Sequence, residues 1–237
     1  MNRFKRYCTA WRRYSRSRGF GIHSPFAYYF VRRVLRERLA YYAYDGLLKH
    51  RNYAKGLVSR HNAGKRIISF SNAKMLFRIA CYFSPKEMLQ IGSTYGVSTM
   101  TLLEVSRQAC VTFYAGENYC DEIFDKVTET RHDRIIKHES LQAAIDGYME
   151  KIADKPGFVL VNNVEEQNVS VVSSLAKLIS ERGGVVVMRN LSRSKVMKQM
   201  WASTSLSLGH GMSFTNYRIG IIVGLKHLPR QNYTLWF

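Results

Sequence analysis

The chain has 237 residues, of which 46% are hydrophobic and 22% charged, a composition typical of a globular protein with one large domain or one domain and an N-terminal extension. No window of 18 apolar residues is present and the first 18 residues lack an apolar segment, which disfavours a membrane span and a signal peptide. The four cysteines, Cys8, Cys81, Cys110 and Cys120, form no C-x₂-C pair, which disfavours a zinc site, and their number is low for a disulfide scaffold. We therefore expect a cytoplasmic protein.

Positive charge is concentrated at the start of the chain. Residues 1–66 contain 17 Lys and Arg and two acids, and so carry +15 of the net charge of +19. Within them, the segment WRRYSRSR (11–18) combines arginine with aromatic residues, as single-stranded nucleic acid binding requires. We predict that residues 1–66 are a basic, mainly helical extension that contacts nucleic acid or another anionic partner. A solvated basic surface is the alternative.

Three helices are expected before the first strand. Ser24 can cap a helix that has Pro25 at its first position, and apolar residues then recur at helical spacing from Phe26. A second, weaker helix followed by a loop is expected within 47–66. A third helix is expected from residue 71 to Pro85, because proline cannot continue a helix.

From residue 87 onward, short apolar segments alternate with helical ones. Strands are predicted at 87–92, 110–116, 134–138, 157–162 and 184–189, and helices at about 97–108, 120–131, 141–152, 168–182 and 194–205. This alternation is typical of βαβ units and a parallel sheet. The segment from residue 211 to the end favours strands with short loops, so we expect antiparallel strands to close the sheet. The chain from 67 to 237 is therefore predicted to be an α/β, Rossmann-like, doubly wound domain.

Gly92 and Gly96 lie between the first predicted strand and the helix that follows it. Ligands of doubly wound sheets bind beyond the carboxyl ends of the strands, where glycines let the chain turn and a ligand approach the backbone. The G-x-x-x-G spacing differs from the dinucleotide-binding and phosphate-loop motifs. Glu117 follows the second strand, where an acid would bind ribose hydroxyls. Together these features indicate a site for S-adenosylmethionine (SAM), and a turn without a ligand is the alternative.

The chain resembles the class I SAM-dependent methyltransferases. More closely, it resembles a Bacteroidetes group of small-molecule O-methyltransferase-like proteins with an N-terminal HSPF motif. The resemblance rests on GFGIHSPFAYYFV, KMLFRIACYFSPKEMLQIGSTYGVST and NYRIGIIVGLKHLPRQNYTLWF, together with Met197 and Trp201. It implies a seven-stranded sheet with a reversed terminal strand, and methyl transfer from SAM to a small-molecule or unknown acceptor. The cofactor site predicted on this basis comprises Gln90, Gly92, Ser93, Gly96, Ser98, Glu117 and Asn162.

Three positions depart from the family's pattern. Gln90 stands two residues before the glycine, where the family usually has an acid, and Asn162 stands at the usual Asp after the fourth strand. Residues 189–193 read RNLSR, where the fifth strand usually ends in Asp-Asp-Ile-His-Trp. In metal-using relatives these carboxylates hold a divalent cation, and amides with Arg189 are poor replacements, so no catalytic metal is predicted.

The change from Asp to Asn at position 162 also removes a candidate general base, so no catalytic residue is assigned. A methyltransferase fold that has lost catalysis and acts as a binding or scaffold protein is therefore the alternative function. The sequence is compatible with a homodimer and does not identify the acceptor.

Overall fold

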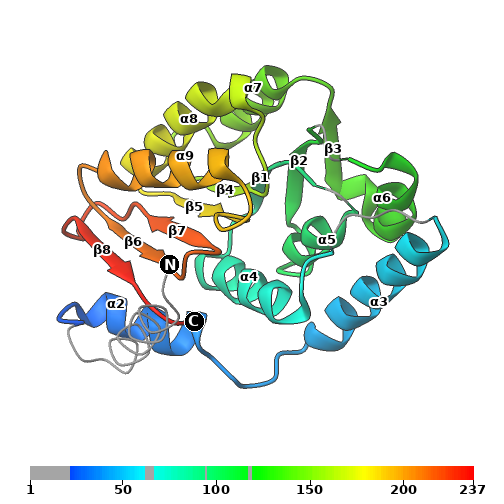
Figure 1. Cartoon of the computed structure of the whole chain (residues 1–237), viewed down its shortest axis with the longest axis horizontal. Helices are drawn as coiled ribbons and strands as arrows, with labels where there is room; N and C mark the ends of the chain where they lie inside the picture. Colours follow the sequence, from blue (N-terminus) through cyan, green and yellow to red (C-terminus); the bar gives the residue numbers. More distant parts are fainter. Residues whose placement is uncertain (1–21, 62–66, 94, 117–118) are drawn as a thin grey trace, which may run out of the picture.

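The computed structural model describes residues 22–61, 67–93, 95–116 and 119–237. Its centre is an eight-stranded sheet in the order β3-β2-β1-β4-β5-β7-β6-β8 (Figure 1). All neighbouring strands are parallel except for β7, which is antiparallel to both β5 and β6. The predicted α/β, Rossmann-like fold is confirmed. The strands are β1 (Glu87–Ile91), β2 (Cys110–Tyr114), β3 (Ile135–His138), β4 (Phe158–Val161), β5 (Val185–Met188), β6 (Met212–Thr215), β7 (Gly220–Val223) and β8 (Gln231–Thr234).

The sheet has one strand more than the seven expected, and the reversed strand is not the last in the chain. The additional strand, β8, pairs in parallel with β6 at the edge of the sheet, with Met212 opposite Gln231. It is four residues long and none of its residues is fully buried. A short, half-exposed edge strand has no clear apolar alternation, so the sequence pattern does not separate it from a loop.

Helices cover both faces of the sheet (Figure 1). One face carries α7 (Leu141–Ile152), α8 (Val169–Glu181) and α9 (Lys195–Leu206), and the other carries α4 (Phe70–Phe83), α5 (Val97–Leu103) and α6 (Asp121–Thr128). Two short 3₁₀ turns, η2 (Glu129–Arg134) and η3 (Glu166–Asn168), complete this part of the chain. None of the helices in the described ranges has the length and hydrophobicity needed to cross a membrane.

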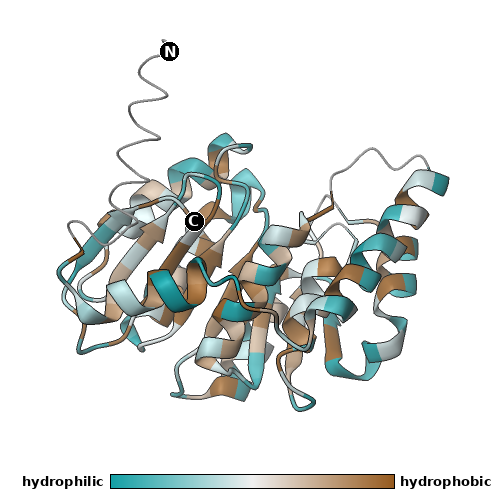
Figure 2. Cartoon of the chain, turned by 90° about the horizontal axis from the view of Figure 1, so that it is seen from below, coloured by the Kyte–Doolittle hydropathy of each residue, from teal (hydrophilic) through white to brown (hydrophobic). Residues whose placement is uncertain are grey.

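Alternate residues of the strands point to the two helical layers, as the pleat of a strand requires. In β1, Leu89 and Ile91 pack in the hydrophobic cluster of α7, α8 and α9, whereas Met88 packs in the cluster on the opposite face. Hydrophobic residues thus gather in the sheet, and hydrophilic residues gather on the outer sides of the helices (Figure 2).

The N-terminal part of the described chain contains α2 (Pro25–Phe30), the π-helical turn η1 (Val31–Leu35) and α3 (Tyr44–Arg60). As predicted, Ser24 caps the first of these helices, because its hydroxyl accepts a hydrogen bond from the Ala27 N–H at 3.3 Å. Phe30 packs against Phe214 of β6 with ring centroids 5.1 Å apart. The helix α3 contacts α4, α5 and α6. The helices of this segment therefore pack on the same core as the sheet.

A buried arginine joins three of these elements. Arg78 of α4 donates from Nε to the Val34 carbonyl at 2.6 Å and from Nη2 to the Leu35 carbonyl at 2.9 Å. Its Nη1 donates to the Tyr44 hydroxyl at 3.0 Å. The last carbonyls of a helix lack partners within the helix, so the guanidinium supplies the donors that the end of η1 needs.

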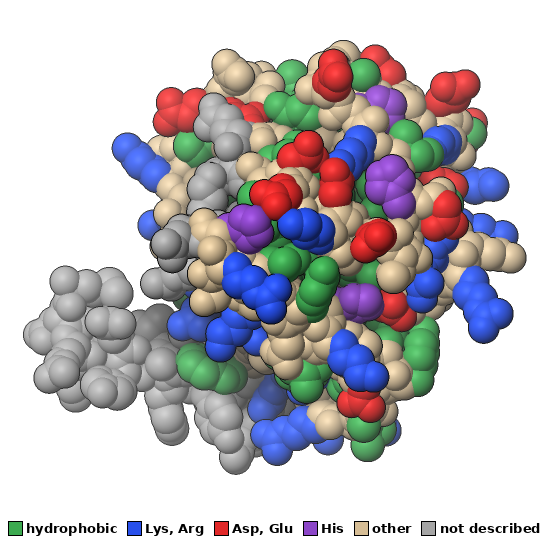
Figure 3. Space-filling model, turned by 90° about the vertical axis from the view of Figure 1, so that its right-hand side faces the viewer, with side chains coloured by type: hydrophobic (Ala, Val, Ile, Leu, Met, Phe, Trp, Pro, Cys, Tyr) green, Lys and Arg blue, Asp and Glu red, His purple; other side chains and the backbone are tan. Residues whose placement is uncertain are grey.

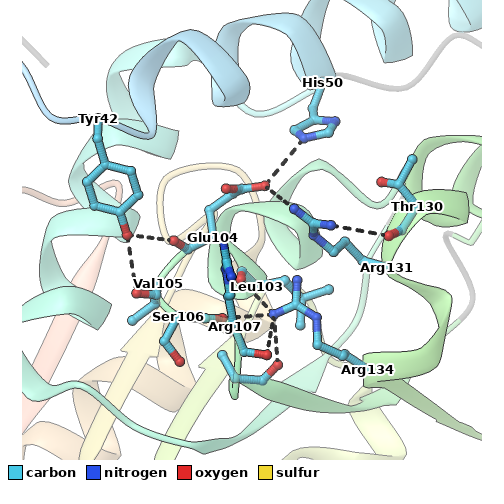
Figure 4. Close-up of polar contacts among 11 residues, drawn as sticks. Tyr42, His50, Leu103, Glu104, Val105, Ser106, Arg107, Thr130, Arg131 and Arg134 are labelled. Atoms are coloured by element: carbon cyan, nitrogen blue, oxygen red, sulfur yellow. Dashed lines mark hydrogen bonds and ion pairs between the residues drawn. The ribbon is translucent and has the colours of Figure 1, made fainter.

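A second polar cluster lies between α3 and the end of α5 (Figure 4). One carboxylate oxygen of Glu104 is 3.6 Å from His50 Nε2 and 3.8 Å from Arg131 Nη2. The hydrogen bond from His50 is the main cause that holds the pKa of Glu104 below its ordinary value. Beneath this pair, Arg134 donates to the Ser106 carbonyl at 2.8 Å.

Candidate functional site

The glycine turn connects β1 to α5. Gly92 and Gly96 both have a φ of +75°, which side-chain-bearing residues rarely adopt. A Cβ atom at Gly92 would lie 2.9 Å from the Asn163 carbonyl oxygen, and one at Gly96 would lie 2.8 Å from Thr128 Cγ2. The Ser93 hydroxyl accepts a hydrogen bond from the Gly96 N–H at 3.3 Å and holds the turn closed. The fold itself therefore requires both glycines, whether or not a ligand binds.

Buried amide groups converge on this turn. Asn162, which follows β4, donates from Nδ2 to the Gly92 carbonyl at 2.6 Å. Gln90 donates from Nε2 to the same carbonyl and to the Ser98 hydroxyl, both at 3.3 Å. The Oε1 atom of Gln90 is buried and has no hydrogen-bond partner in the described part of the chain. The structure thus brings together residues that the sequence analysis had assigned to one site.

The acid predicted to bind ribose, Glu117, lies outside the described residues. A described carboxylate that the sequence analysis missed lies at the same edge of the sheet. Glu165 comes from the loop after β4, and its Oε1 atom would be 2.9 Å from a Cβ atom placed on Gly116. That Cβ position is 3.8 Å from the Gly92 Cα atom, so the ends of β1 and β2 lie close together under this carboxylate.

A cavity of about 520 Å³ opens beside the amide network, and this volume is typical of small-molecule sites. Ser93, Ser98 and Asn162 line it on the side of β1 and β4. Ser71 and Asn72, in the first turn of α4, line another side. Its charged lining comes from three arginines, and no Asp, Glu, His or Lys occurs among the lining residues that the structure describes. The arginines are Arg189, Arg193 and Arg218.

Arg189 is the arginine nearest to the amide network. It follows β5, and its Nη1 donates to Asn162 Oδ1 at 2.6 Å. Its Nε atom is buried and finds no acceptor among the described residues. Burial, and to a smaller extent the charge of Arg193, lowers the pKa of Arg189 to about 10, so the guanidinium is protonated at neutral pH.

The residues at the positions where metal-using relatives of the resembled family carry acids do not fit a divalent cation. The side-chain oxygen of Asn162 already accepts a hydrogen bond from Arg189, and the Asn190 amide donates to the Asn162 carbonyl at 2.9 Å. Hard cations need carboxylate or carbonyl oxygens, and a guanidinium at this distance repels them. Within the described ranges, no group of three or more His, Cys, Asp or Glu side chains is arranged to hold a metal.

The fold is shared with several solved methyltransferases. The O-methyltransferase from Bacillus cereus, solved in complex with S-adenosylhomocysteine (SAH), has a TM-score of 0.58 and 16% sequence identity, covering 77% of this chain and 95% of that chain. TomG from Streptomyces achromogenes, an O-methyltransferase involved in tomaymycin synthesis and solved with SAM, has a TM-score of 0.55 and 14% identity, covering 91% of this chain and 98% of that chain. A putative O-methyltransferase from Klebsiella pneumoniae has a TM-score of 0.54 and 12% identity, covering 84% and 96% respectively.

No protein-family model and no curated protein sequence matches the chain. The likeness to solved structures at these identities shows the fold: the chain has the Rossmann-like architecture of class I SAM-dependent O-methyltransferases.

Proposed function

We propose that the chain is a SAM-dependent methyltransferase of the HSPF-containing Bacteroidetes group that it resembles, acting on a small-molecule acceptor without a catalytic metal. The observation that carries this proposal is the convergence of Gln90, Ser98 and Asn162 on the Gly92 turn, beside an open cavity. SAM and SAH are bound in solved proteins of the same fold. Gln90 is fully buried and is not among the residues that line the cavity, so it acts on the site through its hydrogen bonds to the Gly92 carbonyl and the Ser98 hydroxyl.

The residues present fit a SAM molecule. Ser93, Ser98 and Asn162 offer hydroxyl and amide groups on the cavity wall. Glu165, beside Gly116, offers a carboxylate for a ribose hydroxyl, and Glu117 is proposed for the same role from its place in the sequence. When bound, the sulfonium supplies an electrophilic methyl group: the acceptor lone pair bonds to the methyl carbon as the carbon–sulfur bond breaks, leaving SAH, and the acceptor proton is lost.

The contribution of the chain to such a reaction is positioning. Correct orientation of two reactants can by itself lower the activation barrier by roughly 7–11 kcal/mol, so a methyl transfer needs few catalytic side chains. The described cavity lining holds no Asp, Glu, His or Lys side chain that could remove a proton at neutral pH. The acceptor therefore loses its proton to solvent, or binds already deprotonated.

The test is a calorimetric titration of the full chain with SAM and with SAH. We expect binding in the micromolar range that Glu117→Ala and Glu165→Gln both weaken. Glu181→Gln is the matched control, because Glu181 ends α8 just before the amino end of β5, whereas the candidate site lies at the carboxyl ends of the strands. Absence of binding by folded protein would refute the proposal.

A methyltransferase fold that binds ligands without turnover is the second candidate. The hydrogen bond between Arg189 and Asn162 favours it, since it occupies the place of two acids of metal-using relatives. This candidate predicts that SAH does not accumulate when the SAM-loaded protein is incubated with a panel of phenols, alcohols and carboxylic acids. SAH formation that depends on one acceptor would reject it.

We further propose that residues 1–66, with their charge of +15, form an N-terminal extension that contacts an anionic partner such as nucleic acid, next to a Rossmann domain of 67–237. We also propose that the protein is cytoplasmic and that it forms a homodimer. Sedimentation of the purified chain over a range of concentrations tests the homodimer.

A further inference from the structure

Positive charge dominates one side of the cavity. Arg189, Arg193 and Arg218 line it, and no ion pair between described residues involves any of the three. Two helices begin beside the cavity, α4 at Phe70, between the lining residues Ser69 and Ser71, and α9 at Lys195, two residues after Arg193. Neither has an acid in its first turn. Helix N-termini favour negative charge, so their fields add to those of the arginines.

Two linked turns hold the arginines in place. The Leu191 N–H donates to the Arg218 carbonyl at 3.1 Å, which ties the loop after β5 to the turn between β6 and β7. Asn190 and Tyr217 have φ values of 61° and 68°, a left-handed conformation that non-glycine residues adopt at a cost in free energy. The arginines therefore approach the cavity from two different strand connections that are hydrogen-bonded to each other.

The charge of Arg189 is poorly compensated. The guanidinium of Arg189 has one neutral acceptor, Asn162 Oδ1, and a buried Nε without a described partner. A partly buried cation beside a second one is unfavourable unless an anion neutralises it. Guanidinium groups bind carboxylates and phosphates through paired N–H donors, so the missing partner has the chemistry of an oxyanion.

We propose that this cavity binds a small organic anion, and that the methyl acceptor carries a carboxylate or phosphate group that pairs with Arg189, Arg193 and Arg218. The oxyanion site follows from the geometry of the cavity alone, whereas its assignment to the acceptor rests on the proposed methyltransferase function. A neutral acceptor would leave the partly buried Arg189 guanidinium without an anionic partner.

Arg189 contacts Asn162 and is the arginine nearest to the glycine turn, whereas Arg193 and Arg218 continue the positive side of the cavity away from it. In the sheet order, β5 is two strands from β1, which corresponds to roughly 10 Å at the usual strand spacing. Arg218 precedes β7, which is a further strand away. An oxyanion held between Arg189, Arg193 and Arg218 therefore lies beyond Asn162 as seen from the glycine turn, as an anchor that leaves another atom of the acceptor to receive the methyl group.

The test compares three probes that share a phenyl ring. The full chain is titrated calorimetrically with benzoate, with phenyl phosphate and with the neutral benzamide. We expect at least one of the two anions to bind about tenfold or more tightly than benzamide, because hydrogen bonds to charged groups are stronger than those to neutral ones. The tighter anion identifies the preferred oxyanion.

Variants locate the site. Arg193 and Arg218 are exposed, so Arg193→Gln and Arg218→Gln are expected to fold normally and to remove most of the preference for the anion. Arg189→Gln is expected to remove it as well. Arg107→Gln is the matched control, because Arg107 is an exposed arginine before β2, at the opposite edge of the sheet. Equal affinity for benzoate, phenyl phosphate and benzamide, or an equal loss in the control, would overturn the inference.

A repeat of the titrations in saturating SAH separates the acceptor from the cofactor. Anion binding that persists supports an acceptor site. Anion binding that SAH abolishes would show that the arginines bind the carboxylate of the cofactor itself, and would overturn the acceptor assignment. Binding of the anion without binding of SAM or SAH would support the oxyanion site and overturn the proposed function. Binding of SAH without binding of the anion would support the proposed function and overturn the oxyanion site.

Discussion

Gly92 is the residue on which the candidate site depends most directly. Its φ of +75° and the 2.9 Å approach of a Cβ atom to the Asn163 carbonyl oxygen leave no room for a side chain. We expect Gly92→Ala to lower the free energy of unfolding by roughly 1–3 kcal/mol from the backbone conformation alone. SAM binding should weaken too, because Asn162 is hydrogen-bonded to the same turn. Urea denaturation and calorimetry measure the two effects.

Gly56→Ala is the control for this prediction. Gly56 lies inside α3 and a Cβ atom there would meet nothing within 4 Å. Because alanine is the better helix former, we expect this variant to be more stable by about 0.5–1 kcal/mol. Equal effects of the two substitutions would contradict the special role of the turn.

At this scale, some of the residues that the structure brings together at the candidate site could be predicted from the sequence, and others could not. Gln90, Ser98 and Asn162 were predictable, because each directly follows or ends a strand or begins a helix next to the glycine turn. Glu165, Arg193 and Arg218 were not. Their side chains reach the site across loops, from connections whose course depends on the packing of the whole sheet. The RNLSR segment predicted the loss of the carboxylates. It did not predict that arginines would line a cavity at this place.

At the scale of elements, Arg78 links α4 to η1 and α3. Arg78→Met keeps the length and the apolar stem of the side chain but removes three donors that serve the Val34 and Leu35 carbonyls and the Tyr44 hydroxyl. Unsatisfied buried acceptors cost about 1–3 kcal/mol each, so we expect a loss of at least about 2 kcal/mol in the free energy of unfolding.

Limited proteolysis distinguishes a local from a global effect of Arg78→Met. We expect cleavage between residues 36 and 43, the connection between η1 and α3, at protease concentrations that leave the parent chain intact. Arg51→Met is the comparison, because Arg51 is an arginine with one described hydrogen bond, to the Ile68 carbonyl. A larger effect of Arg51→Met would show that Arg78 does not hold this segment.

The contact between His50 of α3 and Glu104 at the end of α5 makes the stability of the protein depend on pH (Figure 4). The pKa of Glu104 is lowered in the folded state, mainly by the hydrogen bond from His50. Its stabilising effect is therefore complete above the ordinary glutamate pKa of about 4.3 and is lost as the pH falls through the lower, folded-state value. We expect Glu104→Gln to cost about 1 kcal/mol at neutral pH and progressively less in acid, as measured by urea denaturation. A constant difference across that range would contradict the prediction.

Most elements were predictable to within a few residues, and the exceptions have tertiary causes. The helix expected over 97–108 ends at Leu103. Beyond this point, the Arg134 guanidinium donates hydrogen bonds to the Leu103 and Ser106 carbonyls. The Tyr42 hydroxyl donates a hydrogen bond to the Glu104 carbonyl. Local sequence does not report partners that come from 28 or more positions away.

At the scale of the whole molecule, the described part of the basic region shares its face with acids. Figure 3 shows Lys and Arg side chains interspersed with Asp, Glu and His on the side of α3 and α6. His61 is 3.6 Å from Glu122, which also pairs with Lys126. Residues 1–21, in contrast, contain seven arginines and lysines and no acid. We therefore expect the excess positive charge of the first 21 residues to dominate the attraction of an anionic polymer.

Binding of a mixed-sequence RNA oligomer to the full chain, followed by fluorescence anisotropy at several salt concentrations, tests this expectation. Each phosphate neutralised on a single strand adds about 0.7 to the slope of log affinity against log salt. If Arg12, Arg13 and Arg16 each contact one phosphate, changing all three to Gln should lower that slope by about 2. Lys155, Lys177 and Lys198, which are exposed on the Rossmann domain, give a control triple with the same change in net charge. A slope that both triples lower equally would mean that RNA responds only to net charge, and that the N-terminal residues form no specific contact.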